Sequence, residues 1–450
     1  MKWNYDLAMD YIHNAEKLGS IMGVETERQL LSRLSEPQNK LKEIHIAGTN
    51  GKGSVLAMVS TVLTKAGFKV GRYISPTLVT YLERFQINGE YIKPDEFAQI
   101  MERVAAASDD IQSAGFNKPT AFELETAAAY LYFYEQQCDF AVIETGMGGT
   151  YDATNVCDHP LCCVITSIGM DHMGILGNSL TEIAENKAGI IMPETNVVST
   201  LQAPEALKVI LDKCNETGSR LVISDYIKDV HSIQYGDLHE GSYTEYEHER
   251  IGHIKLPLNG TYQIINSCLA VSCLETLRNM GYNISNEDIL GGIEATQWFG
   301  RLSRVGGTPP FFVDGAHNEP AARVLAASVQ EYFTPEKLSG RKLVYIMGVF
   351  ADKDYNSIIK LMAPMAEHIF TIATPDNPRA MSADELALRL NEYYNTNNYD
   401  GNQAESCISI PEAVNKAVTY NDGNVVVLAF GSLSHLNTIR EAYEEWIKIK

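Results

Sequence analysis

The stretch IHIAGTNGKGS, residues 44–54, joins a short β-branched run to a glycine-rich turn that contains a lysine. An apolar helical segment follows directly, from Lys52 to a closing Gly67. In such a strand–turn–helix frame, backbone N–H groups and the helix N-terminus attract an anion. Lys52 would add a mobile positive charge for the β- and γ-phosphates. The stretch therefore predicts a nucleotide-binding loop; the alternative is a glycine-rich turn with an exposed lysine.

This loop departs in two places from the usual phosphate-binding pattern G-x-x-x-x-G-K-[ST]. Ile46 stands where the first glycine belongs. Gly53 stands where the hydroxyl that holds Mg²⁺ belongs, so Ser54 comes one position late. If the loop binds a nucleotide, residues elsewhere in the chain must hold the metal.

Around this loop, β-branched runs alternate with helical segments, which is typical of a mostly parallel sheet covered by helices. Strands are expected at EIHIAG, KVGRYIS, DFAVIETG and CVITSIG. Thr120 is a suitable N-cap for the helix PTAFELETAAAYLYFYEQQ, and Ser179 or Thr181 for the helix SLTEIAENKAGIIM. The polar stretch over residues 229–258 predicts a hairpin on the rim, ahead of the long helix TYQIINSCLAVSCLETLRNMG.

The pattern restarts after a break near residues 297–300, with strands expected at PPFFVDGAH, KLVYIMGV, HIFTIAT and NVVVLAFGS. We therefore predict the α/β class with two domains. Residues 1–297 would form a P-loop domain with a mostly parallel sheet, and residues 298–450 a smaller, Rossmann-like α/β domain. No sequence repeat relates the two halves.

Composition narrows the class of partner. The 450 residues are 45% hydrophobic and 21% charged, with a formal net charge of −21, which argues against a nucleic-acid partner. The N-terminal segment lacks a signal-peptide apolar core, and no apolar run nears the roughly 20 residues that span a bilayer. We expect a cytoplasmic protein without a membrane partner. Cysteines 157, 162 and 163 lie near His159, which could suggest a zinc site, but Cys162 and Cys163 begin the buried strand CCVITSIG, where cysteine serves as a small apolar residue.

Polar residues end the predicted strand DFAVIETG. Open α/β sheets bind ligands at the carboxyl ends of their strands, which makes Glu144 a candidate metal ligand. Gly146, Gly148 and Gly149 would let backbone approach a phosphate. The plain alternative is a carboxylate that merely leaves a strand, and Asp152 could simply cap the following turn.

Two further groups of polar residues are weaker candidates for a functional site. Asp171 and His172 follow the strand CVITSIG and would emerge at the same sheet edge as Glu144, although a single histidine often only bonds locally. Lys187 lies in a helix that is otherwise apolar on one face, and a solvated lysine is its default interpretation.

A set of motifs carries a family resemblance: HIAGTNGKGS, SP at 75–76, ETGMGGTYDATN, DHMGILG, ENKAGI, NGTYQIIN, FGRL, VDGAHN and MGVFADKD. Together they resemble the folylpolyglutamate synthase/dihydrofolate synthase family, which belongs with the Mur-type ATP-dependent amino-acid ligases. The motifs follow the family's order from about residue 28 to 435. In that family the loop does read G-T-N-G-K-G-S, so Gly53 is in pattern.

The resemblance also implies where the metal lies. Magnesium, with two ions expected, would be held by Ser75, Glu144 and His172. Lys187 matches a lysine that CO₂ carbamylates, which converts a cation into an anion near the metals and replaces the solvated interpretation. Two divalent ions beside ATP need anionic ligands, which the phosphate loop itself does not provide.

The implied ATP-binding residues are Gly48, Thr49, Asn50, Gly51, Lys52, Gly53, Ser54, Asn266, Arg301, Asp314 and His317. The implied catalytic residues are Lys52, Lys187 and His172. Arg301 would lie at the domain junction, where a cation reaches phosphates only when the domains close over an active site at their interface.

Three positions depart from the family pattern. Thr77 follows SP where the family often has His, Ser303 follows G-R-L where an acidic residue is usual, and GGTYD lacks a frequent arginine. These departures bear on pterin and glutamate contacts rather than on ATP chemistry.

The resemblance implies an ATP-dependent ligase that joins L-glutamate to folate or dihydropteroate through an acyl phosphate, and we expect a monomer. It does not separate dihydrofolate synthesis from polyglutamate extension. Two alternatives are another Mur-type ligase, against which NGKGS and DGAHN weigh, and a P-loop switch whose ATP turnover is indifferent to glutamate.

Overall fold

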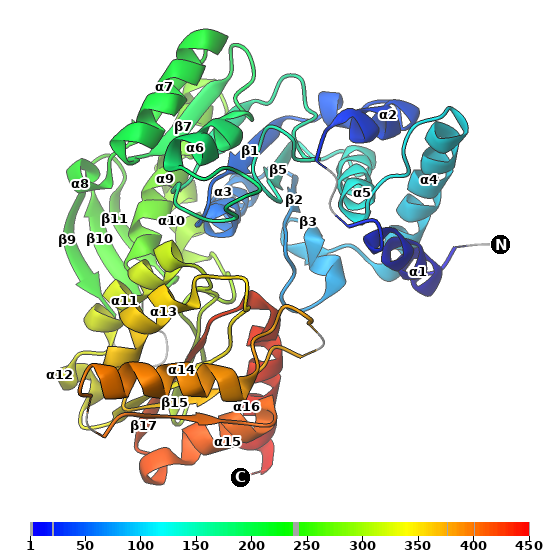
Figure 1. Ribbon diagram of the computed structural model, residues 1–450. Helices are drawn as coiled ribbons and strands as arrows, with labels where there is room; N and C mark the ends of the chain where they lie inside the picture. Colours follow the sequence, from blue (N-terminus) through cyan, green and yellow to red (C-terminus); the bar gives the residue numbers. More distant parts are fainter. Residues whose placement is uncertain (1–2, 20–21, 237–242, 376, 400, 450) are drawn as a thin grey trace. The chain divides into compact units, whose positions relative to one another are not determined.

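The computed structural model describes residues 3–19, 22–236, 243–375, 377–399 and 401–449 (Figure 1). The chain divides into two compact units. Unit 1 comprises residues 1–229 with 265–296, and unit 2 comprises residues 230–264 with 297–450. The sequence division at residue 297 placed residues 230–264 in the first domain, whereas the structure groups them with the second unit.

Unit 1 is built on an eight-stranded sheet with the order β4-β3-β2-β5-β1-β6-β7-β8. The strands from β2 to β8 along this order pair in parallel, and β3 and β4 add an antiparallel edge. Every residue of β1 and β5 is buried, as expected for central strands with both faces covered. The bounds are β1 Glu43–Ala47, β2 Val70–Tyr73, β3 Phe85–Ile87, β4 Glu90–Tyr91, β5 Phe140–Glu144, β6 Cys162–Ile165, β7 Asn196–Thr200 and β8 Arg220–Ser224.

Helices cover this sheet, and α1, α2, α4 and α5 pack together around one apolar cluster (Figure 1). The predicted N-caps Thr120 and Ser179 are confirmed, since each side chain accepts a backbone N–H in the first turn of its helix. The bounds are α1 Tyr5–Glu16, α2 Glu25–Arg33, α3 Lys52–Lys65, α4 Pro94–Ser113, α5 Ala121–Glu135, α6 Leu180–Ala188, α7 Pro204–Thr217, α8 Tyr226–Asp229, α9 Tyr262–Asn279 and α10 Asn286–Glu294.

Unit 2 contains a six-stranded sheet with the order β12-β13-β17-β14-β15-β16, parallel except for β12. Alternating side chains of its strands face α11, α13 and α14 on one side and α15 and α16 on the other. The bounds are β12 Ser303–Gly307, β13 Pro310–Val313, α11 Glu319–Tyr332, α12 Pro335–Leu338, β14 Lys342–Met347, α13 Tyr355–Met362, β15 His368–Thr371, α14 Ala383–Thr396, β16 Gln403–Ser406, α15 Ile410–Thr419, β17 Val425–Phe430 and α16 Leu436–Ile449.

The stretch predicted as a rim hairpin forms three antiparallel strands in the order β11-β10-β9. These are β9 Val230–Tyr235, β10 Thr244–His248 and β11 Gly252–Leu256, and part of the β9–β10 connection lies outside the described residues. The predicted α/β class, with a parallel-rich sheet in each part of the chain, is confirmed.

Two further properties concern the cysteines and the helices. All eight cysteines are free and buried, which agrees with cysteine used as a small apolar residue. Among the described residues, every helix is too short or too polar to cross a lipid bilayer.

Candidate active site

Four neighbouring parallel strands of unit 1 end at one edge of the sheet. In the order β2, β5, β1 and β6, they lead into Ser75, Glu144, the loop 48–51 and the segment 166–172. These segments are distant in sequence, and the topology places them side by side where open α/β sheets bind ligands. The strand ends that lead to the phosphate-loop candidate and to all the predicted metal ligands therefore lie at the same edge of the sheet.

Two glycines give the loop its shape. Gly48 and Gly51 have φ values of +149° and +94°, in the region that glycine favours. A Cβ on Gly48 would collide with the Thr166 side chain, and one on Gly51 would lie 2.5 Å from Asn266 Oδ1. The second contact shows that Asn266, on α9, lies against the loop, and its nucleotide-binding role stays a prediction.

The loop is fastened to the segment that follows β6. The Thr49 N–H donates to Ser167 O at 2.8 Å, and the Ser167 hydroxyl donates to Asn50 O at 3.1 Å. The Thr49 hydroxyl donates to Gly169 O and accepts from Gly169 N–H, both at 3.0 Å. These bonds preorganise the loop backbone before any anion arrives.

Lys52 begins α3 and folds back over the loop. Its Nζ lies 3.2 Å from Gly48 O and 3.4 Å from Thr49 O. The following residues, Gly53 and Ser54, are buried in the first turn of the helix. A phosphate in the loop would therefore meet the lysine ammonium and the N-terminus of α3 together.

Lys187 is buried against the same loop, with only 4% of the residue exposed. Its Nζ donates to Gly48 O at 2.8 Å. Burial, helped by repulsion from Lys52, lowers the pKa of Lys187 to about 7, and Asp171 and Asp152 oppose that shift. The default solvated interpretation of this lysine is therefore wrong.

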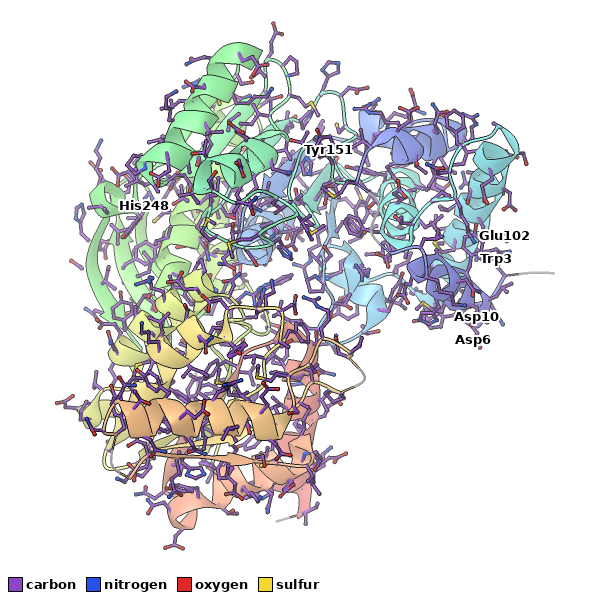
Figure 2. All side chains as sticks on the ribbon, in the orientation of Figure 1. Trp3, Asp6, Asp10, Glu102, Tyr151 and His248 are labelled. Atoms are coloured by element: carbon purple, nitrogen blue, oxygen red, sulfur yellow. The ribbon has the colours of Figure 1, made fainter. Side chains whose placement is uncertain are left out.

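Glycines also bring the C-terminus of α6, where Lys187 lies, against the loop after β5. A Cβ on Gly149 would lie 2.6 Å from Asn186 O, and the Thr150 N–H donates to that same oxygen at 2.9 Å. Gly148, at φ +83°, packs against the Asn186 side chain. Tyr151, in contrast, is 54% exposed on this loop (Figure 2).

Of the two acidic residues of the stretch 142–155, Asp152 has a structural role. Its carboxylate accepts from Met147 N–H at 2.7 Å, Thr154 N–H at 3.1 Å and the Thr154 hydroxyl at 2.6 Å. Burial raises the pKa of Asp152 although these bonds oppose it. Glu144 is also buried and ends β5.

The other predicted metal ligands are less enclosed. Ser75 is half-buried and precedes a cis Pro76. The His172 side chain is 39% exposed, and its Nε2 lies 3.9 Å from Asp171 Oδ2. His172 has a left-handed φ of +49°. The Ser75 hydroxyl and the Glu144 carboxylate are oxygen ligands of the kind that Mg²⁺ prefers, whereas the His172 imidazole is a nitrogen ligand better suited to softer metal ions.

No group of three or more His, Cys, Asp or Glu side chains within the described ranges is arranged to hold a metal ion. The set Ser75, Glu144 and His172 contains only two residues of those types, so it stays a prediction.

In unit 2, Asp314 organises the loop after β13. Its buried carboxylate accepts from Leu302 N–H, Ala316 N–H and the Tyr262 hydroxyl, each at 2.8 Å. Burial raises the pKa of Asp314, and the nearby Arg301 opposes the shift. Tyr262 was not singled out in the sequence, since nothing there distinguishes it from a core aromatic at a helix start.

Arg301 and His317 flank Asp314. The Arg301 guanidinium donates to Gly300 O at 3.1 Å, and a Cβ on Gly315 would lie 2.5 Å from its Nη1. His317 Nδ1 lies 2.8 Å from Gly315 O, which fixes the proton on Nδ1. The three predicted residues of unit 2 thus belong to one loop system.

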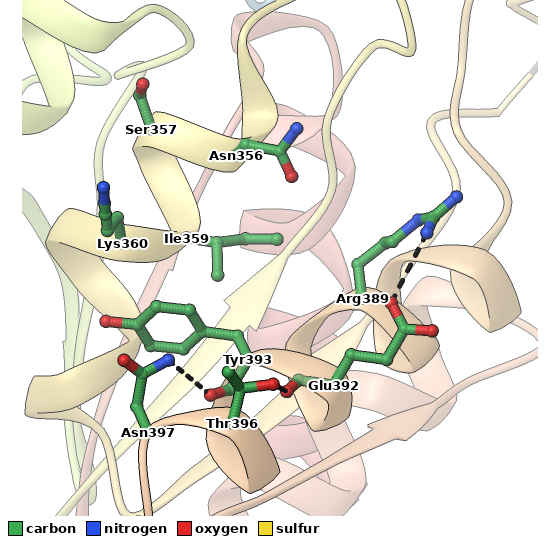
Figure 3. A pocket seen from close by; sticks show the side chains of 9 residues that line it. All are labelled: Asn356, Ser357, Ile359, Lys360, Arg389, Glu392, Tyr393, Thr396 and Asn397. Carbon is green, nitrogen blue, oxygen red and sulfur yellow. Dashed lines mark hydrogen bonds and ion pairs between the residues drawn. The ribbon is translucent and has the colours of Figure 1, made fainter.

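An open groove of about 370 Å³ lies between α13 and α14 in unit 2 (Figure 3). Lys360, Arg389 and the ring of Tyr393 line it, and Arg389 is already paired with Glu385 and Glu392. None of the predicted site residues lines this groove.

Comparison with known proteins assigns the chain to a family of enzymes. Residues 46–274 match the Mur ligase middle domain, and residues 300–433 match the Mur ligase glutamate ligase domain. Together with the phosphate loop, these matches define the chain as an ATP-dependent ligase of the Mur type.

Individual relatives narrow the family. The chain is 34% identical over 445 residues to the dihydrofolate synthase/folylpolyglutamate synthase of Bacillus subtilis, covering 97% of this chain and 98% of that protein. It is 34% identical over 370 residues to the dihydrofolate synthetase of Saccharomyces cerevisiae, covering 78% of this chain and 81% of that protein. The chain belongs to the folylpolyglutamate synthase/dihydrofolate synthase family.

Solved structures agree with this assignment. Folylpolyglutamate synthase of Mycobacterium tuberculosis, complexed with ADP and AMPPCP, matches with a TM-score of 0.83 at 28% identity, over 97% of this chain and 99% of that one. An Escherichia coli relative in complex with DHPP and ADP matches with a TM-score of 0.81 at 26% identity, over 98% of both chains.

Proposed function

We propose that this chain uses ATP to join L-glutamate to a folate, extending polyglutamate tails and converting dihydropteroate into dihydrofolate. The observation that carries the proposal is the loop 48–54, whose Gly48 carbonyl accepts from both Lys52 and Lys187. Relatives with folylpolyglutamate and dihydrofolate synthase names support the substrates. So do related structures with DHPP and ADP, or with AMPPCP and folate.

In the proposed reaction, a folate carboxylate oxygen attacks the γ-phosphorus of ATP and ADP leaves. The amine of glutamate then attacks the acyl carbon, expels inorganic phosphate and loses a proton, which leaves an amide. Lys52 and the N-terminus of α3 would stabilise charge on the transferring phosphoryl group, so positioning and electrostatics carry the catalysis. Exclusion of water protects the acyl phosphate from hydrolysis.

Magnesium would neutralise charge on the ATP phosphates, held by Ser75, Glu144 and His172. Support comes from the sheet topology, which ends β2, β5 and β6 at the edge where the phosphate loop lies. We expect two ions at this edge.

We further propose that Lys187 carries a carbamate. Its amine would attack CO₂ to form an N–C bond and release a proton, and only a neutral amine has the lone pair for this step. Two observations support the proposal: the side chain is buried against the phosphate loop, and its pKa is lowered to about 7. The product would place an anion near Lys52 and the metal ions.

Asn266, Arg301, Asp314 and His317 are proposed to complete the ATP site, with His172 and the two lysines as catalytic residues. The contact of Asn266 with Gly51 and the Asp314 hydrogen bonds that hold the Arg301–Leu302 turn support these roles. We also propose that closure of the N-terminal and C-terminal domains completes the active site. Scattering profiles unchanged by an ATP analogue plus folate would contradict closure.

The test is ADP release with ATP, Mg²⁺ and L-glutamate, using dihydropteroate in one reaction and tetrahydrofolate in another. We expect glutamate-dependent turnover with both substrates, and turnover with one alone would assign the single physiological step. A Lys52→Ala preparation controls for contaminating ATPase. Turnover that is absent with both folates, or indifferent to glutamate, would overturn the proposal in favour of another Mur-type ligase or a P-loop switch.

A further inference from the structure

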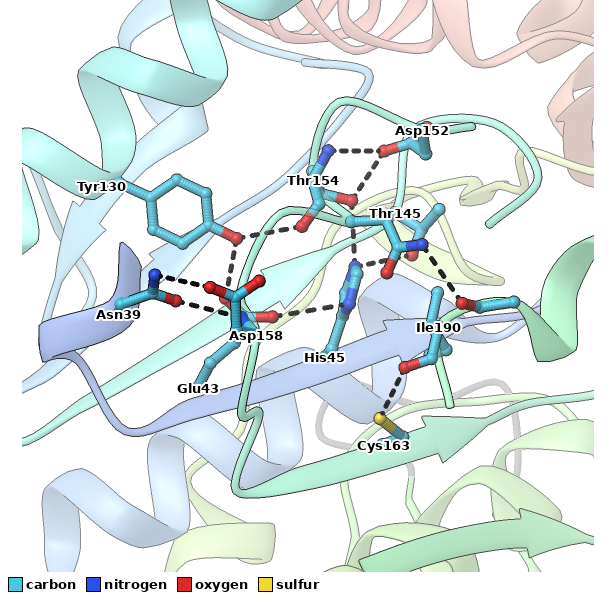
Figure 4. Close-up of polar contacts among 12 residues, drawn as sticks. Asn39, Glu43, His45, Tyr130, Thr145, Asp152, Thr154, Asp158, Cys163 and Ile190 are labelled. Carbon is cyan, nitrogen blue, oxygen red and sulfur yellow. Dashed lines mark hydrogen bonds and ion pairs between the residues drawn. The ribbon is translucent and has the colours of Figure 1, made fainter. Parts of the chain in front are cut away.

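A buried histidine lies beneath the loop that follows Glu144. His45, on β1, is 1% exposed, and its Nε2 lies 2.9 Å from Thr154 Oγ1 and 3.2 Å from Thr145 Oγ1 (Figure 4). Thr145 directly follows Glu144, and Thr154 lies at the other end of the same loop. One imidazole therefore contacts both ends of the segment 145–154.

The hydrogen bonds assign the proton on this imidazole. The Thr154 hydroxyl donates to Asp152 Oδ1 at 2.6 Å, because a carboxylate accepts only. Thr154 Oγ1 must then accept from His45, which places the histidine proton on Nε2. Nδ1 is left as an acceptor and lies 3.4 Å from Glu43 Oε1.

The surroundings of Glu43 agree with that assignment. Burial raises the pKa of Glu43 to about 8 and lowers the pKa of His45 to about 3, so both groups are neutral near pH 7. The Tyr130 hydroxyl donates to Glu43 Oε2 at 2.7 Å, and it also lies 3.1 Å from Thr154 O (Figure 4). A protonated Oε1 would face the unprotonated Nδ1 of His45.

The hydrogen bonds that begin at His45 end at the backbone of the 145–154 loop. Asp152 Oδ1 accepts a hydrogen bond from the Thr154 hydroxyl, and Asp152 Oδ2 accepts one from the Met147 N–H. Contacts thus lead from the strand that enters the phosphate loop, through His45 and Thr154, to the backbone three residues after Glu144.

We propose that His45 is a positioning residue that fixes both ends of the 145–154 loop and thereby sets the placement of Glu144 at the ligand edge. The inference rests on the proposed function, which gives Glu144 its metal. His45 itself touches neither substrate nor nucleotide in this role. Its effect is expected in how much Mg²⁺ the site requires, rather than in folding alone.

The test compares three variants with wild type. His45→Phe keeps a ring but removes both nitrogens, His45→Gln restores an N–H donor near the Nε2 position, and Thr154→Val removes the link from His45 to Asp152. Val198→Ala is the matched control, because Val198 is fully buried on β7, a strand that carries none of the predicted site residues. Binding of a fluorescent ATP analogue is measured across a Mg²⁺ titration, with thermal unfolding alongside.

We expect His45→Phe to raise the Mg²⁺ concentration for half-maximal analogue binding at least tenfold. Thr154→Val should raise it about threefold or more, and His45→Gln should stay within threefold of wild type. Val198→Ala should lower the unfolding temperature without changing the Mg²⁺ requirement. If His45→Phe does not fold, Thr154→Val and His45→Gln decide the proposal.

A purely structural histidine would give the opposite pattern: unfolding temperatures that fall while all variants keep the wild-type Mg²⁺ requirement. That result would overturn the proposal. Absence of folate-dependent turnover in wild type is a separate result, because it contradicts the proposed function while the binding titration still decides the role of His45.

Discussion

The Nζ of Lys187 and the Nζ of Lys52 both lie within hydrogen-bond distance of one acceptor, the carbonyl oxygen of Gly48, at 2.8 and 3.2 Å. Two ammonium groups so close repel each other, and the more buried of the two is the easier to neutralise. Lys187 is that group. The loop carbonyl of Gly48 is therefore contacted by two lysines, of which Lys187 loses its proton more readily.

Lys187 should leave a signature in the pH dependence of stability. Its folded pKa of about 7 lies below the ordinary value of 10.5, so between these values the unfolded chain binds more protons. The stability of wild type relative to Lys187→Met should therefore rise as the pH increases from about 7 to 10.5, by the order of a few kcal/mol. Urea unfolding in CO₂-free buffer measures this difference.

The matched Lys187→Met variant removes the titrating amine and cancels the contributions of other groups. Parallel stability profiles for the two proteins across that pH range would show that Lys187 is protonated in the folded state as in water. Added bicarbonate should stabilise only wild type.

Gly51 should be essential for nucleotide binding because of its position rather than its flexibility alone. Gly51→Ala puts a methyl 2.5 Å from Asn266 Oδ1, and we expect ATP affinity to fall at least tenfold. Gly67→Ala is the control, since Gly67 has the same φ, +93°, with open space around its Cβ. It should cost about 1 kcal/mol of stability and leave ATP affinity unchanged. Equal affinity losses in both variants would contradict the steric argument.

Asp314→Asn should weaken the loop that carries Arg301. The carboxylate accepts three donors, and an amide nitrogen would face at least one of them. We expect a loss of about 2 kcal/mol in unfolding free energy together with weaker ATP binding. Tyr262→Phe removes one donor only and should cost about 1 kcal/mol. Denaturant unfolding with ATP titration checks both, and a larger loss for Tyr262→Phe would show that the tyrosine, not the carboxylate, organises the loop.

Glu144→Gln should raise the Mg²⁺ requirement of turnover about tenfold, because a neutral amide is a weaker ligand for a hard cation than a carboxylate. A Mg²⁺ titration at saturating ATP measures the shift, and a chelator should abolish turnover in wild type. Glu185→Gln, on the exposed surface of α6, is the control for a lost negative charge. Indistinguishable Mg²⁺ titrations of the two variants would remove Glu144 from the metal site.

Local patterns predicted the strand–turn–helix around Lys52, because β-branched runs, glycine and an apolar helix each act within a few residues. They did not assign residues 230–264 to the second unit, since that grouping depends on long-range packing such as the contact of Thr244 with Tyr332. The 20-residue α4 was also missed, although Pro94 followed by Asp95 and Glu96 is a usual helix start.

The site residues also divide into those that the sequence predicted and those that it did not. The alternation of elements predicted Glu144 and His172 at one sheet edge, whereas Ser75 was predicted only from the family resemblance. The burial of Lys187 had no local signal, and only the family resemblance argued against a solvated lysine. His45 likewise gave none, because a polar residue in a strand looks the same whether its partner is water or a buried hydroxyl.

The eight buried cysteines allow local unfolding of the chain to be followed by thiol labelling. Seven of them, Cys138, Cys157, Cys162, Cys163, Cys214, Cys268 and Cys273, belong to unit 1, whereas Cys407 alone belongs to unit 2. A thiol reagent can reach them only when the surrounding structure opens. Because the two units differ in their number of thiols, the mass added per molecule during labelling would show which unit unfolds locally first. Labelling with and without nucleotide would show whether nucleotide protects the thiols of one unit or of both.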